Sequence, residues 1–287
     1  MNFSYSRIQS FLQCPLSYRY AYVDKLLPKP NQKIEEGLMA HKILEGLGNG
    51  KSKEELISEL VKGGADVNTV LKVEDVISKI NVDFTHTKYI EHSFSLNYNN
   101  HDIWGRIDRV DLNEGWELID YKYGSWEYDS SPTLQGLIYS LAWMTNFKLN
   151  SVRFSYVDVK RNKKTGRLYT ENDNFSVIGN FIDEIVKSHS DNNFPAKPSS
   201  RCLNCAFNYH CKEWKNWLND RVKVERPEDV VSNLVRLVER NKLKQKEETK
   251  MREFVKEWLD SQSLTTYSYE DWEILNNGDN IIIRRKE

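Results

Sequence analysis

The 287-residue sequence lacks an excess of charge of either sign, because 41 Lys and Arg residues oppose 42 Asp and Glu residues. A globally basic coat is therefore excluded, and any nucleic-acid site must be a local basic groove. The sequence also lacks any apolar run near the roughly 20 residues that span a bilayer. Its N-terminus has no basic start followed by an apolar stretch, which a signal peptide requires. We expect a cytoplasmic protein without a membrane partner.

Cysteine is scarce as well, with four residues in the whole chain. In a reducing compartment a disulfide framework is the weaker interpretation of such a set. Internal repeats and low-complexity segments are absent. The length allows one large domain, or one domain with an appendage, at roughly 150 residues per domain.

Residue spacing predicts the secondary structure. Helical periodicity covers 4–23, 33–47, 51–82, 133–146 and 175–189, and strand-like alternation covers 92–98, 103–112, 116–124 and 152–160. In the first helix Ser6 and Gln9 fit a capping box, and Asn113-Glu114-Gly115 is a hairpin-sized connection. The order of helices, strand meander, helix, strand and helix predicts a mixed α/β core with one crossover connection.

The chain changes character after Cys211. We expect a long charged helix over 227–260 and a short β-like tail over 264–285. The sequence therefore predicts two domains, with residues 1–221 forming the main one. Residues 222–287 form a helical and β appendage whose role is not assigned.

Acidic and basic side chains gather on two neighbouring strands. The period of two places Leu118, Asp120 and Lys122 on one face, and Asp108 lies across the hairpin from them. Converging carboxylates suit magnesium or manganese, and a lysine beside the metal can orient an attacking water and stabilise charge on a phosphate. These are the parts for hydrolysing a phosphodiester. The alternative is a cross-strand salt bridge on a solvated face.

Four short motifs carry a resemblance to a known family. They are Gly37-Leu38-Met39-Ala40-His41, Gly105 to Asp108, Asp120-Tyr121-Lys122 and Gln135-x-x-x-Tyr139. In order and spacing they resemble the RecB-like branch of the PD-(D/E)XK nuclease superfamily over roughly residues 1–215. The resemblance implies a restriction-endonuclease-like α/β core, in which helices flank a mixed central sheet.

The resemblance also implies roles for individual residues. One or two magnesium or manganese ions would be held by His41, Asp108, Asp120 and the carbonyl of Tyr121. Lys122 would position the water, and Gln135 and Tyr139 would touch substrate or Lys122. Asp120 stands where many members have Glu, which shortens the ligand arm without removing the chemistry. Glu91 either orients a ligand or ends a helix, and the sequence leaves both open.

The cysteines form a distinct soft-ligand set. Cys202, Cys205 and Cys211 are close in sequence and Cys14 is distant, and the spacing alone fits zinc or an iron–sulfur cluster. The arrangement resembles the iron–sulfur clasp of the AddB nuclease domain and the CRISPR-associated exonucleases. That resemblance implies a structural [4Fe-4S] cluster that joins the first helix to the end of the nuclease domain.

Basic residues around the strand 152–160 are a modest indication of a surface that binds backbone phosphates. The set comprises Arg106, Arg109, Lys160, Arg161, Lys163, Lys164 and Arg167. Residues 161–167 are interpreted as a solvated turn that could grip phosphates. Tyrosines and cations interleave in the first helix, as suits single-stranded DNA, although core packing explains most of those tyrosines.

The resemblance and the residues together predict a metal-dependent deoxyribonuclease, an exonuclease acting on single-stranded DNA or DNA ends through a metal-activated water. No nucleotide-binding G-x-x-x-x-G-K-[ST] motif is present, so unwinding would need a helicase or another nucleic-acid-processing partner, and a homo-oligomer is compatible with the sequence. The alternative is a DNA-end-binding subunit of a repair, recombination or CRISPR adaptation complex with little cleavage. A sequence-specific restriction endonuclease ranks lowest.

Overall fold

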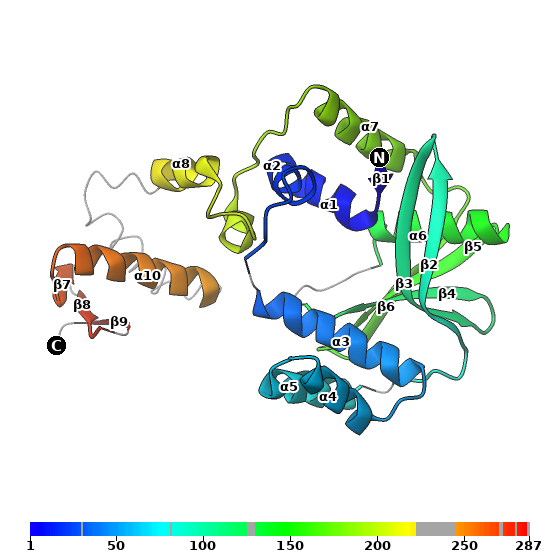
Figure 1. The fold of residues 1–287 in the computed structure, drawn as a ribbon, viewed down its shortest axis with the longest axis horizontal. Coiled ribbons are helices and arrows are strands. Elements are labelled where there is room, and N and C mark those ends of the chain that lie inside the picture. The colour runs from blue at the N-terminus through cyan, green and yellow to red at the C-terminus, as the bar shows by residue number, and fades with distance from the viewer. Residues whose placement is uncertain are drawn as a thin grey trace. The chain divides into compact units, whose positions relative to one another are not determined.

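The computed structural model describes residues 1–29, 31–80, 82–124, 130–221, 245–269, 272–278 and 280–285. It contains two compact units, residues 1–197 and residues 198–287 (Figure 1). The first unit holds every carboxylate, lysine and histidine of the predicted nuclease site. In the described part of the chain, no helix is long and apolar enough to cross a membrane.

The first unit is built on a six-stranded mixed sheet. Its strands are β1 (Asn2–Phe3), β2 (Thr87–Tyr98), β3 (His101–Leu112), β4 (Trp116–Lys122), β5 (Ser151–Asp158) and β6 (Lys163–Thr170). The order is β1-β3-β4-β5-β6, with β2 paired to β3. β4 and β5 run parallel, while β2–β3, β3–β4 and β5–β6 are antiparallel. The predicted hairpin and crossover are therefore both present.

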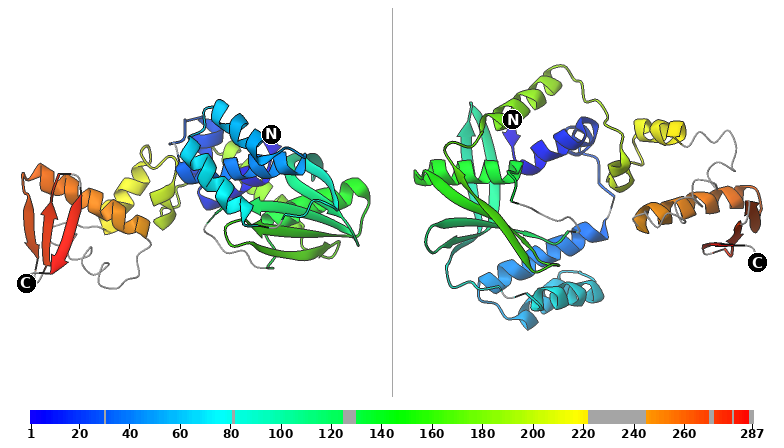
Figure 2. Two further views of the ribbon diagram at one scale, coloured as in Figure 1. Left: turned by 90° about the horizontal axis from the view of Figure 1, so that it is seen from below. Right: turned by 180° about the vertical axis from the view of Figure 1, so that it is seen from behind.

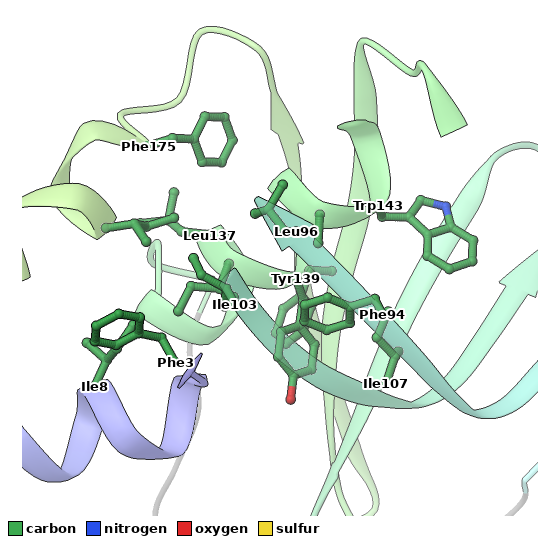
Figure 3. Packing of buried hydrophobic residues seen from close by; sticks show 14 of the residues in the cluster. Phe3, Ile8, Phe94, Leu96, Ile103, Ile107, Leu137, Tyr139, Trp143 and Phe175 are labelled. Carbon is green, nitrogen blue, oxygen red and sulfur yellow. The ribbon is translucent and has the colours of Figure 1, made fainter. Parts of the chain in front are cut away.

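Helices cover both faces of this sheet. Those of the first unit are α1 (Tyr5–Gln13), α2 (Pro15–Tyr18), α3 (Gln32–Gly48), α4 (Lys53–Lys62), α5 (Val67–Ser78), α6 (Leu134–Phe147) and α7 (Ser176–Ser190). The larger core packs α1, α6 and α7 on one face, around Ile107, Ile138 and Ile182. Figure 3 shows Ile8, Ile107 and Leu137 among its members. The smaller core packs α3 and α5 against Ile119 and Tyr121 on the other face. The further views show α3, α4 and α5 grouped together (Figure 2).

The first predicted helix is wrong in its extent. α1 ends at Gln13, Cys14 is extended with φ −165°, and α2 begins at Pro15 before a π-helical turn at Arg19–Val23. Proline disfavours helical backbone in the residue before it, which explains the break. The cap is also different, because Ser4, rather than Ser6, accepts the N–H of Arg7.

The segment predicted as a solvated turn is largely a strand. β6 covers Lys163–Thr170 and pairs with β5 from Ser151↔Thr170 to Asp158↔Lys163. Its lysines and arginine lie on an edge strand, where charged side chains are common because they discourage pairing with another chain. The polar residues of β6 therefore did not predict a strand, because this strand forms by pairing with β5.

The second unit contains a 3₁₀ turn at Ser200–Asn204, α8 (Lys212–Arg221), α10 (Gln245–Ser261) and a three-stranded sheet of β7 (Thr266–Tyr269), β8 (Trp272–Asn276) and β9 (Ile281–Arg285). Val255 and Leu259 of α10 pack on Ile274 and Ile281 of the sheet. The predicted tail strands are confirmed. The predicted helix over 227–260 is confirmed over Gln245–Asp260, and its part before residue 245 lies outside the described residues.

Candidate metal centre

Asp108 occupies an irregular point of the sheet. The ladder between β2 and β3 pairs Ile90 with Arg109 and His92 with Ile107, but Glu91 and Asp108 between them are not paired. On its other side β3 pairs with β4 only from Arg109 onward. Asp108 Oδ2 instead accepts the backbone N–H of Tyr121 at 2.7 Å. The strands therefore separate at Asp108 and leave its carboxylate available.

Three side chains converge at this point. One ligand atom each from His41, Glu91 and Asp108 lies within 4.8 Å of the other two. His41 extends from α3, and its Nδ1 is 3.3 Å from Asp108 Oδ2. Among the described residues no other group of His, Cys, Asp or Glu meets this spacing. An imidazole with two carboxylates is a donor set suited to a divalent cation such as manganese.

Glu91 is the site residue whose role the sequence left undecided. It adopts φ +51°, the left-handed region that non-glycine residues seldom enter, and its Oε2 pairs with Arg106 Nε at 2.6 Å. Burial raises its pKa, and the Asp108 carboxylate adds to the rise. The left-handed backbone places the Glu91 carboxylate beside His41 and Asp108. No sequence pattern predicts this conformation.

Asp120 and Lys122 form a second, adjoining pair on β4. They share one strand face as predicted, and Lys122 Nζ lies 2.6 Å from Asp120 Oδ2. Gln135 bridges them, because its Nε2 donates to Asp120 Oδ1 at 2.5 Å and its Oε1 accepts from Lys122 at 3.0 Å. Thr133 caps α6 by accepting the N–H of Gly136 and also contacts the Tyr156 hydroxyl at 2.9 Å. The start of α6 therefore holds Gln135 in place.

The protonation of this pair follows from its burial. Asp120 is 4% exposed, and burial raises its pKa, with Lys122 opposing the rise. Burial is the largest single influence on Lys122 and acts to lower its pKa, but the charge and the hydrogen bond of Asp120, with smaller contributions from Tyr156 and Tyr5, together raise the pKa, so Lys122 remains an ammonium. Asp120 Oδ2 is fully buried, and the Lys122 ammonium at 2.6 Å is the cation it faces. The donor set of one imidazole and two carboxylates, with this buried carboxylate beside it, fits a divalent metal.

The remaining predicted residues lie further from the trio. Tyr139, one turn after Gln135 on α6, is buried against the rings of Phe94 and Phe154. Figure 3 shows Tyr139 beside Phe94. Tyr121 contributes its N–H to Asp108, and a ligand role for its carbonyl stays a prediction. Gly105 lets the Phe94 ring cross the strand, since a Cβ there would collide with it.

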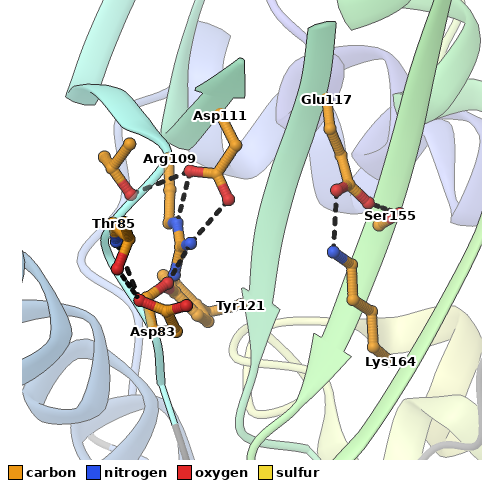
Figure 4. Close-up of polar contacts among 9 residues, drawn as sticks. Asp83, Thr85, Arg109, Asp111, Glu117, Tyr121, Ser155 and Lys164 are labelled. Atoms are coloured by element: carbon orange, nitrogen blue, oxygen red, sulfur yellow. Dashed lines mark hydrogen bonds and ion pairs between the residues drawn. The ribbon is translucent and has the colours of Figure 1, made fainter. Parts of the chain in front are cut away.

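The predicted basic set is mostly neutralised locally. Arg109 is buried against Asp111 at 2.5 Å, reaches the carbonyl of Asp83 and contacts the Tyr121 hydroxyl (Figure 4). Carboxylates of described residues lie beside these side chains: Arg106 with Glu91, Arg109 with Asp111, Lys160 with Glu36, Arg161 with Asp158, Lys164 with Glu117 and Arg167 with Asp173. Arg109 therefore supports the sheet beneath the site.

The four cysteines all lie among the described residues, and none of them forms a disulfide. Three of the sulfurs accept backbone N–H groups, from Lys197 to Cys14, from Ser199 to Cys202 and from Trp214 to Cys211, at 3.3–3.4 Å. Cys14 belongs to the first compact unit and the other cysteines to the second. N–H groups directed at sulfur are one of the features that tune iron–sulfur ligands.

A carboxylate–histidine group beside a buried Asp–Lys pair, on a mixed sheet covered by helices, defines a metal-dependent hydrolase of the nuclease type. A family model of the PD-(D/E)XK nuclease superfamily matches residues 2–212, and the chain belongs to this superfamily. The predicted restriction-endonuclease-like fold is thereby confirmed. A search of curated proteins returns no match.

Two solved structures are similar to this chain. The protein SSO0001 is 13% identical, with a TM-score of 0.35, and the match covers 74% of this chain and 86% of that one. A protein from Eubacterium rectale, described as a "putative exonuclease", is 9% identical, with a TM-score of 0.46 over 75% of this chain and 87% of that one.

Proposed function

We propose that this metal-dependent nuclease is a deoxyribonuclease that removes nucleotides from single-stranded DNA or from DNA ends. The observation that carries the proposal is the adjacency of the His41–Glu91–Asp108 group and the Asp120–Lys122–Gln135 cluster. The first holds three ligand atoms within 4.8 Å of one another, close enough to surround one metal ion. The second holds the ammonium of Lys122 against Asp120.

Different residues of the chain would bind the metal and position the water in hydrolysis. His41, Glu91, Asp108 and Asp120 would hold one or two magnesium or manganese ions, with the Tyr121 carbonyl as a further ligand. When bound, the metal lowers the pKa of water and stabilises negative charge on the phosphate. Lys122 remains protonated, so it orients the nucleophilic water and stabilises charge rather than removing a proton. Gln135 fixes the positions of Asp120 and Lys122 relative to each other.

We also propose a structural [4Fe-4S] cluster on Cys14, Cys202, Cys205 and Cys211. The support is the sequence spacing, the use of every cysteine of the chain, and the N–H groups directed at three of the sulfurs. The RecB-like branch is proposed on the same motifs. The cluster would supply no chemistry to cleavage and would hold its ligands together.

The partners and the compartment stay predictions. A helicase or another nucleic-acid-processing protein would supply unwinding, self-association is allowed, and the cytoplasm is the expected location. The second candidate function, an end-binding subunit with little cleavage, is disfavoured because Asp108, Asp120 and Lys122 are all present and converge.

The test is cleavage of end-labelled single- and double-stranded DNA with manganese and with chelator. We compare wild type, Asp120→Asn and Asp183→Ala, a control that removes an exposed carboxylate on α7. Manganese-dependent release of labelled nucleotides by wild type and the control, with a loss of at least a hundredfold in Asp120→Asn, is expected. Tight binding without cutting by all three proteins would instead favour the end-binding subunit.

A further inference from the structure

A tryptophan stands exposed on the strand that carries Asp108. Trp104 is 52% exposed, and its ring contacts no other aromatic ring within the described part of the chain. Its neighbours Ile103 and Ile107 are fully buried in the larger core, so the strand itself is well anchored. An exposed indole offers a flat face on which a nucleic-acid base can stack.

Trp104, Arg106 and Asp108 follow one another on one side of β3. The alternation of exposure along the strand, with Ile103 and Ile107 inward, places Trp104 and Arg106 on the opposite face. Successive residues on a strand face are separated by about 7 Å. Arg106 continues this row to the metal centre, because its Nε contacts Glu91 at 2.6 Å.

The surroundings leave this row open. Across the ladder, Ser95 faces Trp104 and Ser93 faces Arg106, and neither small side chain covers the indole ring or the guanidinium. On the other edge of β3, β1 pairs only with Asp102 and Ile103, and β4 begins at Arg109. Among the described strands, none pairs with residues 104–108 along that edge. The Arg106 side chain is 65% exposed.

We propose that Trp104 and Arg106 form a nucleotide subsite that guides single-stranded DNA into the metal centre. A base stacks on the indole of Trp104, and the adjoining phosphate binds the guanidinium of Arg106. The backbone then continues to Asp108. Stacking on an indole is open to every base, and a guanidinium binds phosphate through paired N–H groups while Nε faces Glu91.

The chemistry of the row favours DNA over a protein partner. A protein interface would need a wider apolar patch, whereas Trp104 is flanked by serines and an arginine. Duplex DNA offers no free base face in the middle of the helix, so the subsite selects single strands. This inference rests on the proposed function and deepens it by naming the substrate form.

Binding is measured by fluorescence anisotropy of a labelled oligothymidylate and of a blunt duplex, with full-length protein in chelator. Trp104→Ala is expected to weaken single-strand binding about tenfold, to leave duplex binding unchanged and to leave the salt dependence unchanged. Trp104→Phe should retain most of the affinity. Leu168→Ala, an apolar residue 49% exposed on β6, is the matched control and should bind as wild type.

Arg106→Gln gives a second signature. Removing one phosphate contact from a single strand should reduce the slope of log affinity against log salt by about 0.7. Single-strand affinity that is equal in wild type and Trp104→Ala would overturn the proposal, as would an equal loss for single strands and duplex. If wild type is an oligomer and Trp104→Ala is a monomer, Trp104 lies in a protein interface and the proposal is overturned.

These outcomes are separate from the failure of the nuclease itself. Binding is measured without metal, so a protein that cuts normally but ignores Trp104 contradicts only the subsite. A protein that stacks DNA on Trp104 but never cuts contradicts only the proposed cleavage.

Discussion

At the scale of single residues, the site depends on one carboxylate that leaves the sheet ladder. Asp108 accepts the N–H of Tyr121 with the same oxygen that faces His41. The backbone bond fixes the carboxylate in direction before any ligand arrives. Such preorganisation reduces the cost of assembling a site.

Glu91 is expected to be a metal ligand, although the sequence did not distinguish it. Glu91→Gln keeps the size and one acceptor oxygen but removes the charge and replaces the other oxygen by an NH2 donor, so manganese affinity should fall at least tenfold. Isothermal titration calorimetry on the isolated protein measures this directly. Glu117 lies on β4, and its carboxylate pairs with Lys164 of β6. The control variant Glu117→Gln should bind manganese as wild type does. Equal affinity in Glu91→Gln would remove Glu91 from the ligand set.

At the scale of elements, the sequence predicted the parts whose pattern is local. The alternation around Asp120 and Lys122 and the hairpin before β4 follow from short-range spacing, and both are present. β6 was missed because its polar residues become a strand only by pairing with β5. Glu91 was left undecided for a related reason, since its left-handed backbone lies where Glu91 and Asp108 are missing from the β2–β3 pairing, which no single segment encodes.

The joint between α2 and α7 should be sensitive to acid. The Tyr18 hydroxyl lies 3.1 Å from His189 Nε2, and burial lowers the pKa of His189. The folded state therefore favours the neutral ring. The stability it contributes is complete above the ordinary pKa of about 6.5 and is lost as pH falls through the lowered folded-state value.

Thermal unfolding measures this effect in wild type and His189→Gln. Between about pH 7.5 and about pH 5.5 the wild-type midpoint should fall further than the mutant midpoint, because only the wild type must protonate His189. The same acid-induced fall in both proteins would show that the Tyr18–His189 contact does not carry the pH dependence.

At the scale of the whole molecule, the family match and the compact units divide the chain differently. The match ends at residue 212, just after Cys211, whereas the first compact unit ends at Lys197. The cysteine triplet thus lies beyond the first unit but inside the matched family region. The predicted domain boundary near residue 222 stays a prediction.

Cys205→Ser tests the cluster. The purified wild-type protein should be brown and contain iron and sulfide, and the mutant should lose the colour, most of the iron and some stability. Elemental analysis distinguishes the outcomes, since zinc in the wild type would identify a zinc site. Full iron content in Cys205→Ser would contradict the assignment. Asp120→Asn is the control and should keep its iron.

The left-handed backbone at Glu91 has an evolutionary consequence. Glycine occupies that conformation without the penalty that glutamate bears, commonly about 1 kcal/mol, so Glu91→Gly should make the protein more heat-resistant. The same change removes a carboxylate from the metal group. Selection for thermostability alone would therefore enrich a folded, inert variant, and the persistence of glutamate at this position would record selection for catalysis.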